Sequence, residues 1–429
     1  MNGIQSLFPS LILRRLGKDF KQIGGESIWM MSAYVVKSVF QTLSFILLAR
    51  QLKSSEYGEF VSVLAFMTIL ASFFDFGAYS HAMSMISRKY SIESVKYILL
   101  SLLFYGFLGM LLLVSILKNY IFPNFDTVAY YLLFAACIVG DKMQAIFMGI
   151  SLANSFSKKS AIFESTNWIV RFFLVILLVF LHGKSFEWSM IYSAQSIIMG
   201  FLGLFLLGRV NATENSKNRI KTSRIHFLEG CQFALGALTK SMSTDADKVI
   251  LSRFVSPQSV AVYTIAYRFV NMAYLPLHAL FSSTYQKFFA LGQSGIEHSI
   301  KFALRLMPIT VLYSLLTFTC IYFLSDFIDR LIGGSFIGVS VAVQYLAALL
   351  VIQAIHQPLA DAYSGAGKQS FRNALQLSIT VLNIGINIIL IPRYGWLGAC
   401  ISAILTSFIM LLLYCYVSLR DLRNVGDFK

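Results

Sequence analysis

The sequence has few charged residues for its length. Of 429 residues, 13% are charged, whereas a soluble domain carries about 25%. This deficit, together with a hydrophobic share of 57%, excludes an ordinary soluble domain and predicts that most of the chain lies in lipid. The apolar runs are continuous, so we expect helical spans, in which every backbone N–H and C=O is satisfied within the segment.

Cysteine is also scarce, and its placement argues against disulfides and zinc sites. The five cysteines are isolated within apolar runs, are odd in number and form no C-x-x-C pair. The sequence contains no G-x-S-x-G, no dinucleotide fingerprint and no metal-ligand spacing among its six histidines. A glycine-rich stretch at 364–370 departs from the phosphate-loop pattern, because Ala362 and Gln369 stand at two of its required positions. We therefore expect no enzyme activity, no metal and no resident cofactor.

Twelve apolar runs are long enough to cross a bilayer, each of about 20 residues. They lie at approximately 26–49, 57–80, 96–117, 127–150, 160–181, 187–208, 227–252, 258–285, 300–324, 338–362, 371–391 and 395–418. If the spans alternate from a cytoplasmic N-terminus, the cytoplasmic segments hold 21 of the 35 Lys and Arg residues and the opposite side holds seven. This bias is the positive-inside rule. Most of the net charge of +15 is therefore a topology signal, and we expect no nucleic-acid partner.

The domain organisation follows from these runs. Residues 1–25 mix apolar residues with four basic ones, which is typical of an interfacial helix on an anionic membrane surface. Residues 26–208 are predicted to form one six-helix bundle and 227–418 a second. The basic stretch 209–226 is the cytoplasmic linker between them, and 419–429 form a cytoplasmic tail.

A short pattern occurs once in each predicted bundle. LLARQLKSSEYGEF at 47–60 aligns with ILSRFVSPQSVAVY at 250–263 at an offset of 203 residues, which places Arg50 on Arg253. The offset maps the first span onto the seventh and the second onto the eighth. Since six spans separate the copies, the repeats have parallel topology, related by an axis along the membrane normal.

Charged residues within or at the ends of the spans are candidates for function, because a charge near the bilayer centre costs roughly 2.5–3.5 kcal/mol on insertion scales. The basic ones are Lys37, Lys142, Arg171, Lys240, Lys248, Arg268 and Arg305. The carboxylates are Asp75, Asp141, Glu164, Glu229, Asp245, Asp247 and Asp361.

The repeat offset carries Lys37 onto Lys240. The seventh span has a polar stripe at helical spacing, made of Gly236, Lys240, Ser243, Thr244, Asp247 and Lys248. Lys37, Gln41 and Ser44 form a shorter stripe in the first span. Two such stripes predict a water-filled cavity between the halves. The structural alternative pairs Asp141 with Lys142, and Asp247 with Lys248, in buried networks that only fix packing, while Lys37 extends to an interface.

Three segments resemble a known family. LLARQLKSSEYGEFVSVLAFMTILASFFDFGAYS resembles the first helical hairpin of the Wzx-type O-antigen and polysaccharide flippases of the multidrug/oligosaccharidyl-lipid/polysaccharide exporter (MOP) superfamily. DADKVILSRFVSPQSVAVYTIAYRFVNMAYLPL matches the second hairpin, and NIILIPRYGWLGACISAILTS matches the junction of the last two spans. The resemblance covers about residues 26–420. One departure is Ala261, which stands where Gly58 sits in the first hairpin.

The resemblance implies a bacterial inner-membrane flippase with two six-helix bundles arranged in a V. It would move undecaprenyl-pyrophosphate-linked oligosaccharide by alternating access. Lys37 and Lys240 would bind the pyrophosphate, with Lys142, Arg171, Lys248 and Arg268 beside them. Asp75, Asp245, Asp247 and Asp361 would couple transport to H⁺ or Na⁺. The expected partners are the lipid-linked oligosaccharide, membrane lipids, and the polymerase and chain-length regulator of the same pathway.

Three alternatives remain open. A multidrug antiporter of the same superfamily would export cations and is expected to have a cavity dominated by carboxylates. A polysaccharide polymerase would need a large periplasmic loop, and the longest such connection here is roughly 325–338. A scaffold for cell-wall assembly would have little need for buried lysines.

Overall fold

The computed structural model describes residues 10–208, 223–332 and 336–426, and these residues form helices and short connections without any strand. The predicted all-α architecture is confirmed. The helices are α1 (Ser10–Gln51), α2 (Ser54–Phe74), α3 (Ala78–Ser87), α4 (Ile92–Ile121), α5 (Thr127–Ala135), the π-helical segment η1 (Ala136–Gly140), α6 (Asp141–Ala153), α7 (Ser157–Phe180), α8 (Ser185–Gly208), α9 (Ser223–Phe254), α10 (Pro257–Gly292), α11 (Ile296–Ile332), α12 (Val339–Gly365), α13 (Gln369–Tyr394) and α14 (Trp396–Gly426).

Each of the twelve predicted runs falls on one of these helices or on a consecutive set. The second run corresponds to α2 with α3, and the fourth to α5, η1 and α6. In the described part of the chain, ten segments are long and apolar enough to cross a membrane, and the two remaining long helices are α9 and α10. Several helices start at residues that cap them. Ser256, for example, accepts the N–H of Ser259, and Pro257 occupies the first turn of α10.

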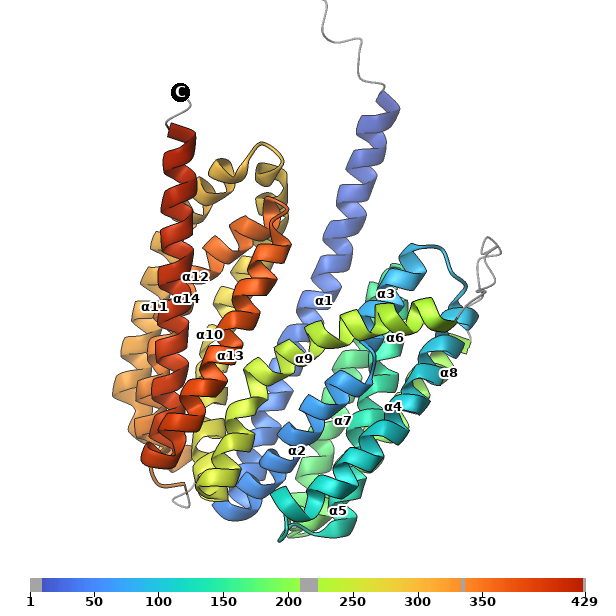
Figure 1. The fold of residues 1–429 in the computed structure, drawn as a ribbon, viewed down its shortest axis with the longest axis vertical. Coiled ribbons are helices and arrows are strands. Elements are labelled where there is room, and N and C mark those ends of the chain that lie inside the picture. Colours follow the sequence, from blue (N-terminus) through green and yellow to red (C-terminus); the bar gives the residue numbers. More distant parts are fainter. Residues whose placement is uncertain (1–9, 209–222, 333–335, 427–429) are drawn as a thin grey trace, which may run out of the picture.

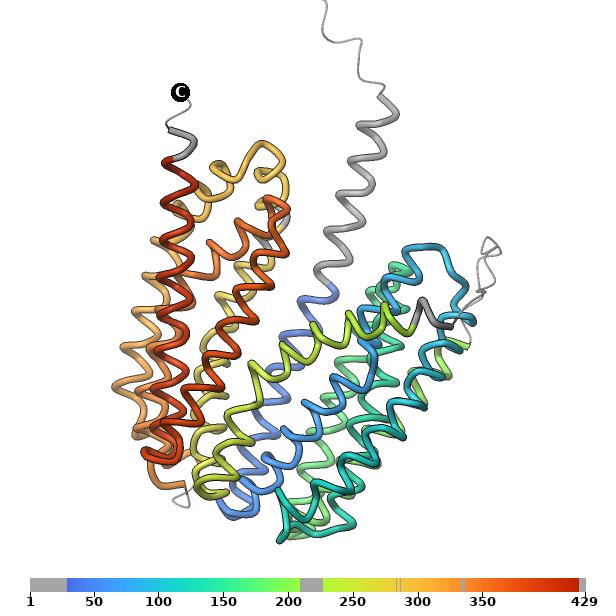
Figure 2. The backbone as a smooth tube through the Cα atoms, in the orientation of Figure 1, coloured from blue at the N-terminus to red at the C-terminus, as the bar shows by residue number. Residues whose placement is uncertain are grey.

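The helices form two bundles that meet at one end and diverge toward the other (Figure 1). The helices α2 to α8 belong to the N-terminal bundle, and α10 to α14 to the C-terminal bundle. The first helix, α1, packs along α7 of the N-terminal bundle. The beginning of α1 and the end of α14 lie at the diverging end (Figure 1), and the coloured parts of both helices run toward it in Figure 2. We call this the open end, and the other the closed end.

Helix α9 contacts both bundles. The part of α9 up to Ser241 packs on α2 and α3, where the side chain of Arg88 donates to Glu229 at 2.6 Å and Ser72 is 2.6 Å from Ser241. Its second half approaches α10 and α13. The domain boundary placed at 227 from the sequence stays a prediction; this position lies within α9, which contacts both bundles.

Parts of the predicted terminal and linker segments lie outside the described residues, namely 1–9, 209–222 and 427–429. Residues 10–25 continue directly into the first span as part of α1. Whether residues 1–25 lie on a membrane surface therefore stays a prediction.

The closed end is held by a close approach of α2 and α10. A Cβ atom added at Gly58 would lie 1.7 Å from the carbonyl oxygen of Pro257. Only glycine allows this contact, because backbone atoms cannot move aside as a flexible side chain can. Its counterpart in the repeat, Ala261, is fully buried. The alanine that replaces the family's glycine in the second hairpin therefore lies in the packed interior, whereas Gly58 lies where the two bundles meet.

The repeated arginines explain why the pattern occurs twice. Arg50, at the end of α1, donates its Nε–H to the carbonyl of Leu331 at the end of α11, 2.6 Å away. Arg253, at the end of α9, lies over the ring of Tyr120 at the end of α4, 5.1 Å from its centroid. Each arginine thus crosses from its own repeat to the third span of the other repeat, as a parallel pseudo-twofold arrangement requires.

Candidate functional site

Two adjoining cavities lie between the bundles. The first, of about 660 Å³, is lined mainly by α9, α10, α12, α13 and α14. The second, of about 870 Å³, is lined mainly by α1, α2, α6, α7 and α8. We call them the C-cavity and the N-cavity. Both volumes fall in the range of about 300–1,000 Å³ that is typical of small-molecule sites.

The two cavities share a seam formed by Tyr34, Gln41, Lys240 and Arg268, which line both. The ring of Tyr34 stacks on that of His278 from α10, with 4.9 Å between centroids, so α1 and α10 touch at this level. Within the described part of the chain, neither Lys240 nor Arg268 has a carboxylate within ion-pair distance. The seam therefore holds two positive charges without a counter-ion.

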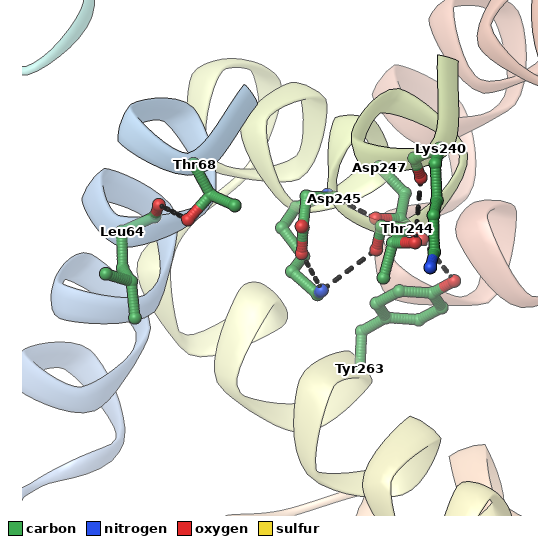
Figure 3. Close-up of polar contacts among 8 residues, drawn as sticks. Leu64, Thr68, Lys240, Thr244, Asp245, Asp247 and Tyr263 are labelled. Carbon is green, nitrogen blue, oxygen red and sulfur yellow. Dashed lines mark hydrogen bonds and ion pairs between the residues drawn. The ribbon is translucent and has the colours of Figure 1, made fainter. Parts of the chain in front are cut away.

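Of the described residues, Asp247 on α9 is the one carboxylate that lines the C-cavity. Its Oδ2 accepts the hydroxyl of Tyr263 from α10 at 2.5 Å. Figure 3 shows this pair beside Lys240 and Thr244, with Asp245 on another face of the same helix. The stripe predicted from the sequence is therefore correct for Lys240, Ser243, Thr244 and Asp247, all of which line this cavity.

Lys248 and Asp245 line neither cavity and bind each other instead. The Lys248 ammonium donates to a carboxylate oxygen of Asp245 and to the carbonyl of Thr244, the latter at 2.9 Å. Pairing Lys248 with the adjacent Asp247 was wrong, because neighbouring residues on a helix point about 100° apart and cannot face each other.

The same error applies to Asp141 and Lys142. Asp141 lines the N-cavity and accepts the hydroxyl of Ser196 at 2.5 Å. Lys142 points elsewhere and forms an ion pair with Asp75 at 2.9 Å. Asp75 also accepts the backbone N–H of Gly77 at 2.7 Å. Neither member of the Lys142–Asp75 pair lines the C-cavity or the N-cavity, so neither is placed to touch a substrate there.

We therefore expect Asp75 and Lys142 to stabilise the fold. Replacing Asp75→Asn should lower stability by about 3–5 kcal/mol, because it leaves a largely buried ammonium without its counter-ion. Adding Lys142→Met should restore much of the loss, and the double variant should still transport. Thermal melting of the purified variants and complementation of a deletion strain measure the two effects. A double variant that is stable but does not transport would show that Asp75 has a role in transport, such as the ion coupling predicted for it.

The N-cavity contains the other predicted cations. Lys37 is 2.8 Å from a carboxylate oxygen of Glu164, which also accepts the indole N–H of Trp168. Arg171 lies between the rings of Trp168 and Tyr192, 4.8 and 4.5 Å from their centroids. These contacts hold Lys37 and Arg171 in place, but only Lys37 has a carboxylate to balance its charge. Lys37 therefore differs electrostatically from Lys240, the lysine that the repeat matches to it.

The Arg171 guanidinium has a further partner that holds its orientation. Its Nε and Nη2 both donate to Oε1 of Gln195, at 3.0 and 2.9 Å. Gln195 in turn donates to the side-chain oxygen of Asn167, and Asn167 donates to Gln144 at 2.8 Å. The cation is thus part of a satisfied network that reaches three helices of the N-terminal bundle.

Sequence reasoning missed Arg372, which it assigned to the cytoplasmic segments. Its Nη1 is 3.1 Å from Oδ1 of Asp361 and 2.7 Å from the hydroxyl of Ser364, and it lines the C-cavity. Asp361 lies in a smaller neighbouring cavity together with His278. Its place in the sequence could have identified it: Arg372 lies one turn inside α13 and on the same helix face as the polar residues Gln376 and Asn383.

The cavities together are lined by more basic than acidic side chains. The basic ones are Lys37, Arg171, Lys240, Arg268 and Arg372, and the acidic ones are Asp141, Glu164 and Asp247. Among the described residues, no group of three or more His, Cys, Asp and Glu side chains could hold a metal ion. The arrangement therefore suits an anion better than a cation.

Residues 23–285 match a protein family described as "Polysaccharide biosynthesis protein". The chain belongs to this family. No curated protein sequence matches the chain significantly.

Solved structures of other proteins share the fold of this polysaccharide biosynthesis family member. One is "Lipid II flippase MurJ, inward closed conformation", with a TM-score of 0.70 and 16% identity over 91% of this chain and 87% of that one. A second, "Inward-facing conformation of a multidrug resistance MATE family transporter of the MOP superfamily", has a TM-score of 0.67 and 14% identity over 91% and 98%. The chain therefore has the fold of these MOP superfamily structures, and its long apolar helices make it a multi-pass membrane protein.

A third structure bears on the charge of the cavities. It is titled "Reverse polarity of binding pocket suggests different function of a MOP superfamily transporter from Pyrococcus furiosus", with a TM-score of 0.60 and 16% identity over 93% of this chain and 95% of that one. Pocket polarity therefore differs within this fold, so the substrate must be argued from the charges in each chain.

Proposed function

We propose that this protein moves an undecaprenyl-pyrophosphate-linked oligosaccharide across the bacterial inner membrane by alternating access. The observation that carries the proposal is the seam, where Lys240 and Arg268 are uncompensated and accessible from both cavities. A diphosphate supplies the missing negative charge, and attraction between ions is stronger in a shielded cavity than in bulk water. The family description supports a role in polysaccharide biosynthesis.

The shape supports one step of such a cycle. The bundles touch at the closed end and diverge at the end where α1 begins and α14 ends. With cytoplasmic termini, as the distribution of basic residues predicts, the cavities open to the side where lipid-linked sugars are assembled. The TM-score is higher for the inward-facing transporter, 0.67, than for a second MATE family structure, solved in an outward-facing conformation, 0.58. Transport would then require the closed end to separate.

The polyprenyl tail remains in lipid in this mechanism, while the headgroup enters between the bundles. The contact of Tyr34 with His278 is the place where α1 and α10 would part for the tail. The acid that faces the C-cavity, Asp247, is our candidate for coupling to H⁺ or Na⁺, since its protonation or ion binding would change the charge next to Lys240. The polymerase of the same pathway would receive the product.

Reconstitution tests the proposal. Purified protein is placed in vesicles with undecaprenyl-pyrophosphate-linked oligosaccharide, and a lectin in the outer solution reports the fraction of sugar on the outside. We expect the protein to equilibrate the glycolipid between leaflets, whereas vesicles without protein should not.

The same vesicles discriminate the antiporter hypothesis. A multidrug exporter of cations would accumulate or release a lipophilic cationic dye in response to a proton or sodium gradient. Dye transport without any movement of the glycolipid would refute the flippase assignment. The excess of basic side chains in the cavities favours the flippase.

A further inference from the structure

The deep part of the N-cavity, beyond the seam, has a composition that the pyrophosphate does not explain. Toward the closed end, its wall consists largely of aromatic rings: Phe45, Tyr57, Phe60, Trp188 and Tyr192. They contact one another in tilted or edge-to-face arrangements, with Phe60 6.3 Å from Trp188 and 6.0 Å from Tyr192 between centroids. These rings form a rigid, largely apolar wall.

Two polar groups in this wall have no partner in the described part of the chain. Trp188 is 3% exposed and the N–H of its indole is unsatisfied, and Ser44 is 7% exposed with an unsatisfied hydroxyl. Both side chains line the N-cavity. A buried donor without a partner costs roughly 1–3 kcal/mol. By contrast, the side chains of Gln144 and Asn167, which also line this cavity, are hydrogen-bonded. Unsatisfied groups in a cavity wall are suited to a ligand that supplies their partners.

We propose that the deep N-cavity binds a neutral sugar ring of the lipid-linked substrate. A pyranose has an apolar face of C–H groups, which suits aromatic rings, and an edge of hydroxyls, which both donate and accept hydrogen bonds. The hydroxyl edge would satisfy the Trp188 N–H and the Ser44 hydroxyl. A sugar with a free ammonium group is disfavoured, because the acids of this cavity already have partners: Glu164 binds Lys37 and Asp141 binds Ser196.

The order of the groups along α1 fits the order of groups in the substrate. Ser44 follows Lys37 by seven residues, which is about 10 Å along the helix, and it lies on the side of the closed end. In a lipid-linked sugar, the pyrophosphate lies between the tail and the sugar. A headgroup whose diphosphate is at the seam therefore carries its sugar deeper, toward the end that must open for release. This inference rests on the proposed function and specifies how its substrate is held.

Binding of two lipid probes to the full-length protein in nanodiscs tests the inference. One probe is undecaprenyl pyrophosphate alone, and the other carries a single neutral hexose. We expect the wild-type protein to bind the hexose-bearing probe at least about tenfold more tightly. Trp188→Phe and Ser44→Ala should each reduce this gain by roughly threefold to tenfold and should leave the affinity for the bare lipid unchanged.

The stability of the variants separates recognition from structure. Ser44→Ala removes only a hydroxyl that has no partner in the described part of the chain, so its melting temperature should stay equal or rise. Trp188→Phe also removes buried ring atoms, so its melting temperature should fall modestly. Equal affinity of the wild-type protein for the two probes, or equal weakening of both probes by the variants, would overturn the sugar site while leaving the flippase assignment intact. If the wild-type protein binds neither probe, the proposed function and the sugar site both fail.

Discussion

Replacing Lys240 and Arg268 together with glutamine is expected to abolish export of surface polysaccharide while the protein still reaches the membrane. Both residues line both cavities, and neither has a carboxylate partner in the described part of the chain. A cation 4 Å from a phosphate oxygen contributes on the order of 4 kcal/mol at an effective dielectric constant of 20. Even a third of this energy corresponds to roughly tenfold in affinity per cation, so the double variant should lose about a hundredfold.

Complementation of a deletion strain measures this effect, with membrane levels followed by immunoblot. Lys301→Gln is the matched control, because Lys301 is exposed on α11 and pairs only along its own helix with Glu297. It should restore polysaccharide fully. Lys240→Arg with Arg268→Lys keeps both charges and should restore part of the export. Full export by the glutamine variant would show that the seam does not bind the substrate.

The single substitution Gly58→Ala is expected to reduce transport by about tenfold or more. The new Cβ would overlap the carbonyl of Pro257, so α2 and α10 must move apart at the closed end. Overpacking of this kind costs about 1–3 kcal/mol, and about 1.4 kcal/mol changes a population ratio tenfold. The state with a sealed closed end would be depleted, and with it the alternation between the two sides.

Spin labels on the two sides of the closed end measure the separation directly. Lys53→Cys and Phe254→Cys place labels at exposed positions in a background without the native cysteines. Gly58→Ala should lengthen their distance. Gly385→Ala is the matched control, since no atom lies within 4 Å of a Cβ added there. At a helix position without such a contact, alanine is favoured over glycine by roughly 0.5–1 kcal/mol, so Gly385→Ala should not harm the protein. If Gly58→Ala leaves both the label distance and transport unchanged, the close contact of α2 with α10 is not needed.

The spans could be predicted from the sequence because lipid imposes a local rule. Each segment must be apolar over about 20 residues and must satisfy its own backbone, which a single sequence reveals. The parallel repeat was also readable, since Arg50 and Arg253 recur at a fixed offset. Helices α9 and α10 fall outside the apolar class, and both carry polar residues that line the cavity, such as Lys240 on α9 and Arg268 on α10.

The candidate site could be predicted only in part. Sequence spacing identified the face of α9 that lines the C-cavity, because the helical period relates residues within one element. It could not show that Lys142 binds Asp75, or that Glu164 neutralises Lys37, since these partners come from different helices. It also missed Arg372. A basic residue near a helix end is usually interpreted as a sign of membrane orientation, and only the structure shows that Arg372 pairs with Asp361.

The sequence by itself thus determined that the chain crosses the membrane many times, that it is built from two similar halves, and that cations lie inside. Those properties depend on composition and on short-range periodicity. Only the tertiary structure decided which cations remain without a counter-ion, where the halves touch, and which buried groups in the cavity wall lack a partner. These depend on side chains far apart in the chain, whose distances are fixed by the packing of helices against one another.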